Sequence, residues 1–248
     1  MQIIAARTLV DVQSGLKFAK RPQWIQRKLV FLDLHDRCVK STDLDGNVQI
    51  IGALPHLPKS LHVLAAEQFL CDTVVDIHGG TYVANVGFDF LNPLVDPVRT
   101  GIIIYIGADG KSSVAADELY FPNGMTISLD NKALIIAESL GHRLTAYSIG
   151  PAGILENRRV WAQFEDEINP EGICLDREGG IWTAGAGCRA LLVKEGGIIE
   201  RQVTTKRPVF AAALGGPDQN YLFLCTSDSN DPVITRQVAG ATIDFAEV

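Results

Sequence analysis

The chain has 248 residues, of which 47% are hydrophobic and 21% are charged, a composition typical of globular proteins. Its formal net charge of −7 argues against a nucleic-acid partner and against an anionic membrane surface. The sequence has no apolar run of about eighteen residues, so we expect no membrane-spanning helix.

The cysteines and the first residues indicate a cytoplasmic protein. Five cysteines are scattered along the chain without a CxxC pair. An odd, dispersed set is typical of reduced thiols, most of them buried. The opening MQIIAARTLVDV lacks the basic start, the long apolar core and the cleavage site of a signal peptide. We therefore expect cytoplasmic localisation and neither a disulfide framework nor a zinc framework.

Short strand patterns dominate the chain, and residues 59–69 are the single helix candidate. Apolar runs rich in β-branched and aromatic residues alternate with Gly, Asp and Asn turns. In chain order the main runs are LVFLDL, TVVDI, TYVANV, GIIIYI, ALIIAE, GIIERQV, YLFLCT and TIDFAEV. This pattern predicts an all-β barrel, sandwich or propeller.

A recurring turn favours the propeller. Asp76, Asp130, Asp176 and Asp218 each stand in a turn between the first and second strand of a unit. These units recur at the length of a four-stranded propeller blade, roughly 40–50 residues, and a sandwich has no reason to repeat at that period. The complete units are residues 24–54, 73–119, 124–165, 172–204, and 209–248 with the N-terminal strand.

The ends of the chain are expected to share a blade. The final strand, ATIDFAEV, should join the last unit together with the N-terminal strand, which leaves no long open edge. Each third strand begins near a basic residue such as Lys40, Arg143 or Arg189. We predict a single β-propeller domain over residues 1–248.

The sequence Pro-x-Gly opens two of the units, at Pro122-Asn123-Gly124 and Pro170-Glu171-Gly172. In a propeller, a residue just before the innermost strand points into one mouth of the central channel. Polar side chains from several blades converge at that mouth, where a metal or a small substrate can bind. Asn123 and Glu171 are therefore predicted to face a shared site.

Several segments resemble the regucalcin/gluconolactonase family of six-bladed propellers. FPNGMTISLDNKALIIAES and NPEGICLDREGGIW are similar to its most characteristic segments, and VVDIHGGTYVANVGFDF and GLKFAKRPQW match in the same order. The resemblance covers nearly the whole chain. Only the ten residues AAEQFLCDTV stand where a second blade is expected. The resemblance thus implies a six-bladed type whose second blade is missing or reduced, which would leave five blades.

The resemblance also implies a chemistry. The family's enzymes hold a divalent metal with a Glu from the first blade, an Asn from an Asn-Asp pair, the Asn of Pro-Asn-Gly and the Asp of Pro-Asp-Gly. The metal polarises a lactone carbonyl, and a carboxylate helps to activate water. The implied partner of this chain is a small lactone or carbonyl compound.

This chain departs from that ligand set at two positions. Asn123 is kept and Glu171 replaces the aspartate, but Cys71 stands for the other asparagine and Lys20 for the first-blade glutamate. A protonated lysine has no lone pair and repels a dication. The interpretation is that Lys20 takes the place of the cation and pairs with Glu171. Calcium, zinc or manganese held by Asn123 and Glu171, with Asp72 as a third ligand, is therefore disfavoured.

Three functions stay open at this point. The first is a gluconolactonase-like hydrolase; the second is a metal-independent hydrolase, lyase or cyclase that uses Lys20 and Glu171. The third is a ligand-binding propeller without catalysis, although the retained polar positions favour an enzyme. The predicted catalytic residues are Lys20, Glu171 and Asp72, and the predicted substrate-binding residues are Asn123, Cys71, Asn85, Asp89 and His142.

Overall fold

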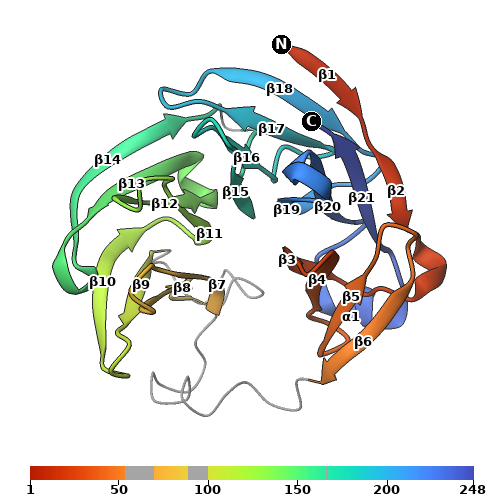
Figure 1. The fold of residues 1–248 in the computed structure, drawn as a ribbon, viewed down its shortest axis with the longest axis horizontal. Coiled ribbons are helices and arrows are strands. Elements are labelled where there is room, and N and C mark those ends of the chain that lie inside the picture. Colours follow the sequence, from red (N-terminus) through yellow and green to blue (C-terminus); the bar gives the residue numbers. More distant parts are fainter. Residues whose placement is uncertain (54–69, 89–99, 166) are drawn as a thin grey trace. The chain divides into compact units, whose positions relative to one another are not determined.

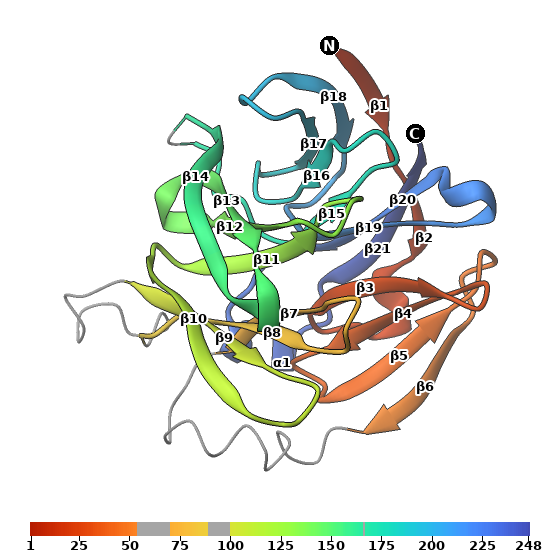
Figure 2. The same ribbon diagram turned by 60° about the vertical axis from the view of Figure 1, so that its left-hand side comes forward.

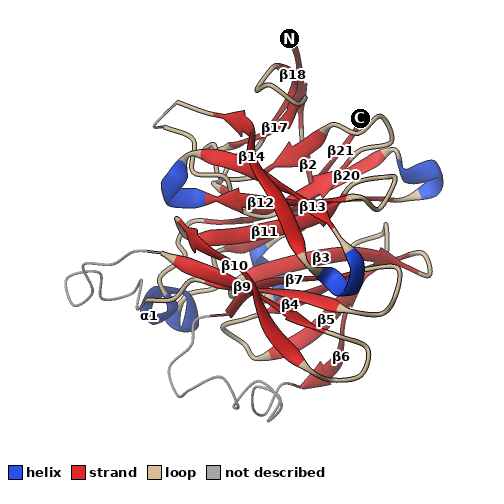
Figure 3. Ribbon diagram, turned by 90° about the vertical axis from the view of Figure 1, so that its left-hand side faces the viewer, coloured by secondary structure: helices blue, strands red, loops and turns tan. Residues whose placement is uncertain are grey.

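The computed structural model describes residues 1–53, 70–88, 100–165 and 167–248, and strands make up most of the regular structure in them (Figure 3). These strands form five sheets. The short helices among them are η1 (Val12–Ser14), η3 (Ser139–Gly141), η4 (Pro151–Gly153), η5 (Pro217–Gln219) and α1 (Pro232–Gln237). The helix candidate 59–69, the site candidate Asp89 and residues 65–69 of the segment expected in place of a second blade lie outside the described residues.

Three of the sheets are antiparallel and follow the chain order strand by strand. The first comprises β3 (Ala19–Ile25), β4 (Lys28–Asp33), β5 (Cys38–Thr42) and β6 (Val48–Ala53). The second comprises β7 (Leu70–Val75), β8 (Thr81–Asn85), β9 (Gly101–Ile106) and β10 (Ser112–Leu119). The third comprises β11 (Pro122–Ile127), β12 (Ala133–Glu138), β13 (Arg143–Ile149) and β14 (Leu155–Gln163).

The two remaining sheets each include a strand from the N-terminus. One has the order β1-β18-β17-β16-β15, and the other has the order β19-β20-β21-β2. Their strands are β1 (Gln2–Ala5), β2 (Arg7–Val10), β15 (Ile173–Leu175), β16 (Ile181–Thr183), β17 (Arg189–Val193), β18 (Ile199–Thr204), β19 (Val209–Gly215), β20 (Tyr221–Ser227) and β21 (Ala241–Glu247).

The pairing of the two chain ends is confirmed. Strand β2 lies antiparallel beside β21, with Arg7 opposite Phe245 (Figure 2). Strand β1 adds a contact that the sequence analysis did not foresee, because it pairs in parallel with β18, Gln2 opposite Arg201 (Figure 1). The N-terminal residues therefore contribute one strand to each of two sheets.

The predicted aspartate turns are confirmed, and hydrogen bonds explain them. Asp76 Oδ1 accepts the backbone amides of His78 and Gly80, both at 2.8 Å. Asp176 Oδ1 accepts the amides of Glu178 and Gly180 in the same way. An aspartate that bonds to the backbone two residues ahead stabilises a tight turn without a partner strand, so the turn is encoded locally.

The strands pack into two compact units. The first unit comprises Met1–Val63, Trp182–Leu192 and Ile199–Val248, and its core gathers around Leu29, Phe31, Phe223 and Ile243. The second unit comprises Leu64–Ile181 and Val193–Ile198, and its core gathers around Tyr82, Ile103, Leu134 and Ile136. A single domain over residues 1–248 stays a prediction. In the described part of the chain, no helix is long and apolar enough to cross a membrane.

Candidate functional site

Asn123 lies at the centre of a polar cluster at the start of β11. The residue is 5% exposed. Its Oδ1 accepts a hydrogen bond from the thiol of Cys71, with Sγ and Oδ1 3.3 Å apart, and its Nδ2 donates to Ser139 Oγ at 3.2 Å. Ser139 Oγ in turn donates to the carbonyl oxygen of Pro170 at 2.7 Å. These bonds fix the orientation of the Asn123 amide.

The backbone of Glu171 contacts the start of β11, next to Asn123. Its carbonyl oxygen accepts the amide of Gly124 at 3.0 Å, and strand β11 packs against β15. A Cβ atom at Gly124 would lie 2.4 Å from that carbonyl oxygen and 2.6 Å from the amide nitrogen of Ile173. The glycine of Pro122-Asn123-Gly124 is therefore needed so that two backbone segments can approach each other closely.

Asp72 ties β7 to β11 beside this point. Its Oδ2 accepts the amide of Met125 at 2.8 Å, and its Oδ1 accepts the amide of Thr73 at 2.8 Å. Both carboxylate oxygens thus hold the backbone in position. We call Cys71, Asp72, Asn123, Ser139 and Glu171 the Asn123 cluster, and all five residues belong to the second unit.

Two other predicted binding residues of the second unit have local partners. Asn85 is buried at the end of β8, where its Oδ1 accepts the amide of Gly87 at 2.8 Å. His142 ends η3 in a left-handed conformation, and its Nδ1 lies 3.1 Å from the carbonyl oxygen of Ile168. These contacts order two loops, and a role for either residue in binding stays a prediction.

Lys20 belongs to the first unit. Its Nζ donates to the carbonyl oxygen of Phe210 at 3.0 Å and lies 5.8 Å from the ring centres of both Phe18 and Phe210. A cation between two aromatic faces is held by cation–π attraction. The pairing of Lys20 with Glu171 stays a prediction.

The donor set does not fit a divalent metal well. The amide oxygen of Asn123 accepts the Cys71 thiol, and both oxygens of Asp72 accept backbone amides. No group of three His, Cys, Asp or Glu side chains in the described residues could hold a metal ion. A hard cation prefers several oxygen ligands, and the oxygens of two of the predicted ligands, Asn123 and Asp72, are already engaged with protein donors.

A buried ion pair beside the cluster escaped the sequence analysis. Glu138 is fully buried, and Arg143 donates to its two oxygens from Nε at 2.9 Å and from Nη2 at 3.0 Å. Thr145 Oγ1 and the amide of Tyr120 donate to the same carboxylate. Burial alone would raise the pKa of Glu138, but these hydrogen bonds outweigh it and hold the pKa below its ordinary value.

This ion pair orders the turn that supplies Ser139. Glu138 ends β12, Arg143 begins β13, and η3 between them carries Ser139. The sequence signal was a glutamate closing the apolar run ALIIAE, with an arginine five residues later. A buried charge of this kind needs an opposite partner, so the pair could have been found.

Regucalcins are among the curated proteins that are similar to this chain. Regucalcin from Sus scrofa is 29% identical over 161 residues, which cover 62% of this chain and 53% of that protein. Regucalcin from Homo sapiens is 26% identical over 159 residues, with coverages of 62% and 53%. The matched region therefore spans about half the length of these curated relatives.

Solved structures confirm the predicted all-β propeller. A calcium-binding regucalcin from Agrobacterium tumefaciens superposes with a TM-score of 0.79 at 15% identity, over 100% of this chain and 96% of that chain. A gluconolactonase from Xanthomonas campestris gives a TM-score of 0.71 at 20% identity, over 98% and 90%. At such identities the likeness shows the fold alone. The five described sheets correspond to five blades, related to the six-bladed propellers of this family.

The family model described as the SMP-30/gluconolactonase/LRE-like region matches residues 24–228, which is most of the chain. The segments quoted above, from FPNGMTISLDNKALIIAES to NPEGICLDREGGIW, lie inside this match. The chain therefore belongs to the SMP-30/gluconolactonase/LRE-like family.

Proposed function

We propose that this protein is a hydrolase that opens a small lactone, or acts on a related carbonyl compound, at the Asn123 cluster. One observation supports this most: Cys71, Asn123 and the backbone of Glu171, far apart in the sequence, meet at the start of β11. These are the positions at which the family resemblance predicts the site. The Xanthomonas campestris neighbour is described as a gluconolactonase, which agrees with this class of substrate.

The chemistry that we assign needs one base and one hydrogen-bond donor. The carboxylate of Glu171 takes a proton from a water molecule while the water oxygen attacks the lactone carbonyl carbon. The bond between that carbon and the ring oxygen then breaks, and Glu171 returns the proton to the ring oxygen. The product is the open hydroxy acid, so one lactone and one water are consumed.

Asn123 supplies the donor. One N–H of its Nδ2 binds Ser139, and we assign the other to the carbonyl oxygen, where negative charge develops during attack. Cys71 is a positioning residue in this proposal, because its thiol engages Oδ1 and thereby sets the direction of Nδ2. No step is assigned to a metal, because the oxygens of Asn123 and Asp72 already accept protein donors.

Replacing Glu171 with glutamine tests the proposal. We expect kcat for δ-gluconolactone or another small lactone to fall by about a hundredfold or more, because an amide cannot take the proton. Acid release in a weakly buffered pH-indicator assay measures the rate. Glu178→Gln is the matched control, since this carboxylate lies in a turn with 73% of its side chain exposed, and we expect its rate to be unchanged.

The acid-release assay, together with calorimetric titration of the same lactones, separates the rival functions. Equal rates in Glu171→Gln and wild type would overturn the assignment of the base. If no lactone in a panel were hydrolysed while one bound with saturable heat, the protein would be a ligand-binding propeller instead of a hydrolase. Activity that survived in Glu171→Gln but disappeared in Lys20→Met would favour Lys20-dependent chemistry.

Metal titration is a separate test. We expect wild type to give no saturable heat with calcium, zinc or manganese, and its lactonase activity to survive dialysis against a chelator. Lys20→Glu restores a carboxylate at the position where the family resemblance implies a ligand, and it is the comparison variant for calorimetry. A stoichiometric metal in purified wild type, measured by elemental analysis, would contradict the metal-free proposal.

A further inference from the structure

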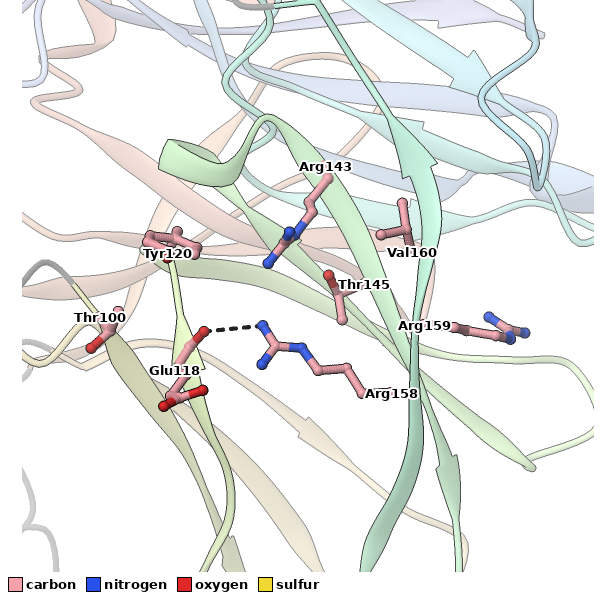
Figure 4. A pocket seen from close by; sticks show the side chains of 8 residues that line it. All are labelled: Thr100, Glu118, Tyr120, Arg143, Thr145, Arg158, Arg159 and Val160. Atoms are coloured by element: carbon pink, nitrogen blue, oxygen red, sulfur yellow. Dashed lines mark hydrogen bonds between the residues drawn. The ribbon is translucent and has the colours of Figure 1, made fainter.

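A pocket of about 660 Å³ lies in the second unit, outside the Asn123 cluster (Figure 4). Its volume falls in the range of small-molecule sites. Strands β10, β13 and β14 supply most of its wall. The lining residues are Thr100, Glu118, Tyr120, Arg143, Thr145, Arg158, Arg159 and Val160. The activity proposed above does not use this pocket.

Two arginines point toward each other across the pocket, Arg143 from β13 and Arg158 from β14 (Figure 4). Arg143 binds Glu138 through two hydrogen bonds, and Nη2 of Arg158 lies 3.5 Å from Glu138 Oε1. Two guanidinium groups therefore share one fully buried carboxylate. This part of the wall carries an excess of one positive charge.

The other acidic groups nearby do not cancel that excess. Arg158 binds Glu118 and Asp117 through their backbone carbonyl oxygens, at 3.0 Å and 3.4 Å. Both side chains are exposed, and in Figure 4 the carboxylate of Glu118 is turned away from the Arg158 guanidinium. Exposed carboxylates are screened by water and salt much more than a partly buried pair is. Arg159 points away from the pocket and pairs with Glu195 at 3.1 Å.

Aromatic rings hold both guanidinium groups in place. The Cζ atom of Arg143 lies 5.7 Å from the ring centre of Tyr120, and that of Arg158 lies 6.0 Å from the ring centre of Tyr147. A guanidinium group has five N–H donors. The contacts in the described structure leave some of them on each arginine for a ligand. Fixed arginines lose little side-chain entropy when they bind an oxyanion.

We propose that this pocket binds a small molecule that carries a carboxylate or phosphate group between Arg143 and Arg158. Planar guanidinium groups match the oxygen geometry of both anions. The exposed ring of Tyr120 and the exposed side chain of Val160 give the rest of the ligand an apolar contact. The ligand is therefore expected to pair its anionic group with an apolar or ring-shaped part.

Calorimetry on the full chain tests the proposal with three probes: inorganic phosphate, phenyl phosphate and benzoate. We expect saturable, salt-sensitive binding of at least one probe at low ionic strength, and tighter binding of phenyl phosphate than of inorganic phosphate. The ratio between phenyl phosphate and benzoate tells whether the natural ligand is a phosphate or a carboxylate. Arg158→Gln should weaken binding by roughly tenfold or more, because a charged hydrogen-bond donor is lost.

Two comparison variants keep the result interpretable. Arg158→Lys retains the positive charge above Tyr147 and should fold like wild type. It loses the planar guanidinium group, so it should bind the anionic probes more weakly. Lys132→Gln removes one exposed positive charge from the β11–β12 turn and should bind like wild type. No saturable binding of any probe to wild type would overturn the proposal. Equal binding by Arg158→Gln and Lys132→Gln would overturn it as well.

Discussion

Replacing Gly124 with alanine is expected to lower the free energy of unfolding by about 2–4 kcal/mol and to abolish most of the proposed lactonase activity. The added Cβ would lie 2.4 Å from Glu171 O, 2.6 Å from Ile173 N and 2.8 Å from Gly172 Cα. All three are backbone atoms, so rotation of a side chain cannot relieve the overlap. The backbone must move and break the 3.0 Å bond from Gly124 N to Glu171 O. Asn123 would then shift relative to Glu171.

Urea unfolding followed by circular dichroism measures the stability, and the acid-release assay measures the activity. Gly52→Ala is the matched control, because its Cβ would meet only the side chain of Val39, at 3.7 Å. We expect the control to change stability by less than about 1 kcal/mol. If Gly124→Ala were as stable and as active as Gly52→Ala, the close approach of β11 to residue 171 would not be needed.

The fold could be predicted from the sequence because the turn residues and apolar runs that indicate it are local patterns. The carboxylates of Asp76 and Asp176 each accept hydrogen bonds from the amides two and four residues ahead, so five consecutive residues determine each turn. Each turn separates two short apolar runs, and this repetition predicts blades. The pairing of β1 with β18 had no such signal, because it joins residues that are about 200 positions apart and depends on tertiary packing.

Only some residues of the candidate site could be predicted from the sequence. The Pro-x-Gly pattern pointed to Asn123 and Glu171, and the resemblance added Cys71. Ser139 was missed because a serine after a strand usually marks a turn, and its bonds to Asn123 and Pro170 cross long sequence distances. Asp72 was predicted as a catalytic residue, but a sequence does not show that both its oxygens accept backbone amides.

Replacing Arg143 with methionine is expected to lower the free energy of unfolding at neutral pH by about 3–5 kcal/mol. Glu138 is fully buried, and this variant would leave it with the more distant Arg158 as its remaining cation. A buried carboxylate whose remaining ion pair, to Arg158, is 3.5 Å long loses more stabilisation than the lost packing of the Arg143 side chain accounts for. The mutual attraction between Arg143 and Glu138 can be isolated by a double-mutant cycle with Glu138→Gln. The double variant should be more stable than Arg143→Met alone, because its buried group is neutral.

The dependence of this effect on pH has a defined sign. The pKa of Glu138 is lower in the folded state than in the unfolded chain, so its stabilising contribution is present above the unfolded pKa. That contribution disappears as the pH falls through the folded pKa. The stability difference between wild type and Arg143→Met should therefore be largest at neutral pH and should shrink in acid.

An exposed ion pair supplies the control for this prediction. Lys111 pairs with Asp109 at 3.0 Å, but 88% of the lysine side chain is exposed. Lys111→Met should change the free energy of unfolding by less than about 1 kcal/mol, because water solvates both charges already. Equal effects of Lys111→Met and Arg143→Met would mean that Glu138 is solvated rather than buried. A stability difference that grew in acid would reverse the expected linkage and show that Arg143 does not lower the pKa of Glu138.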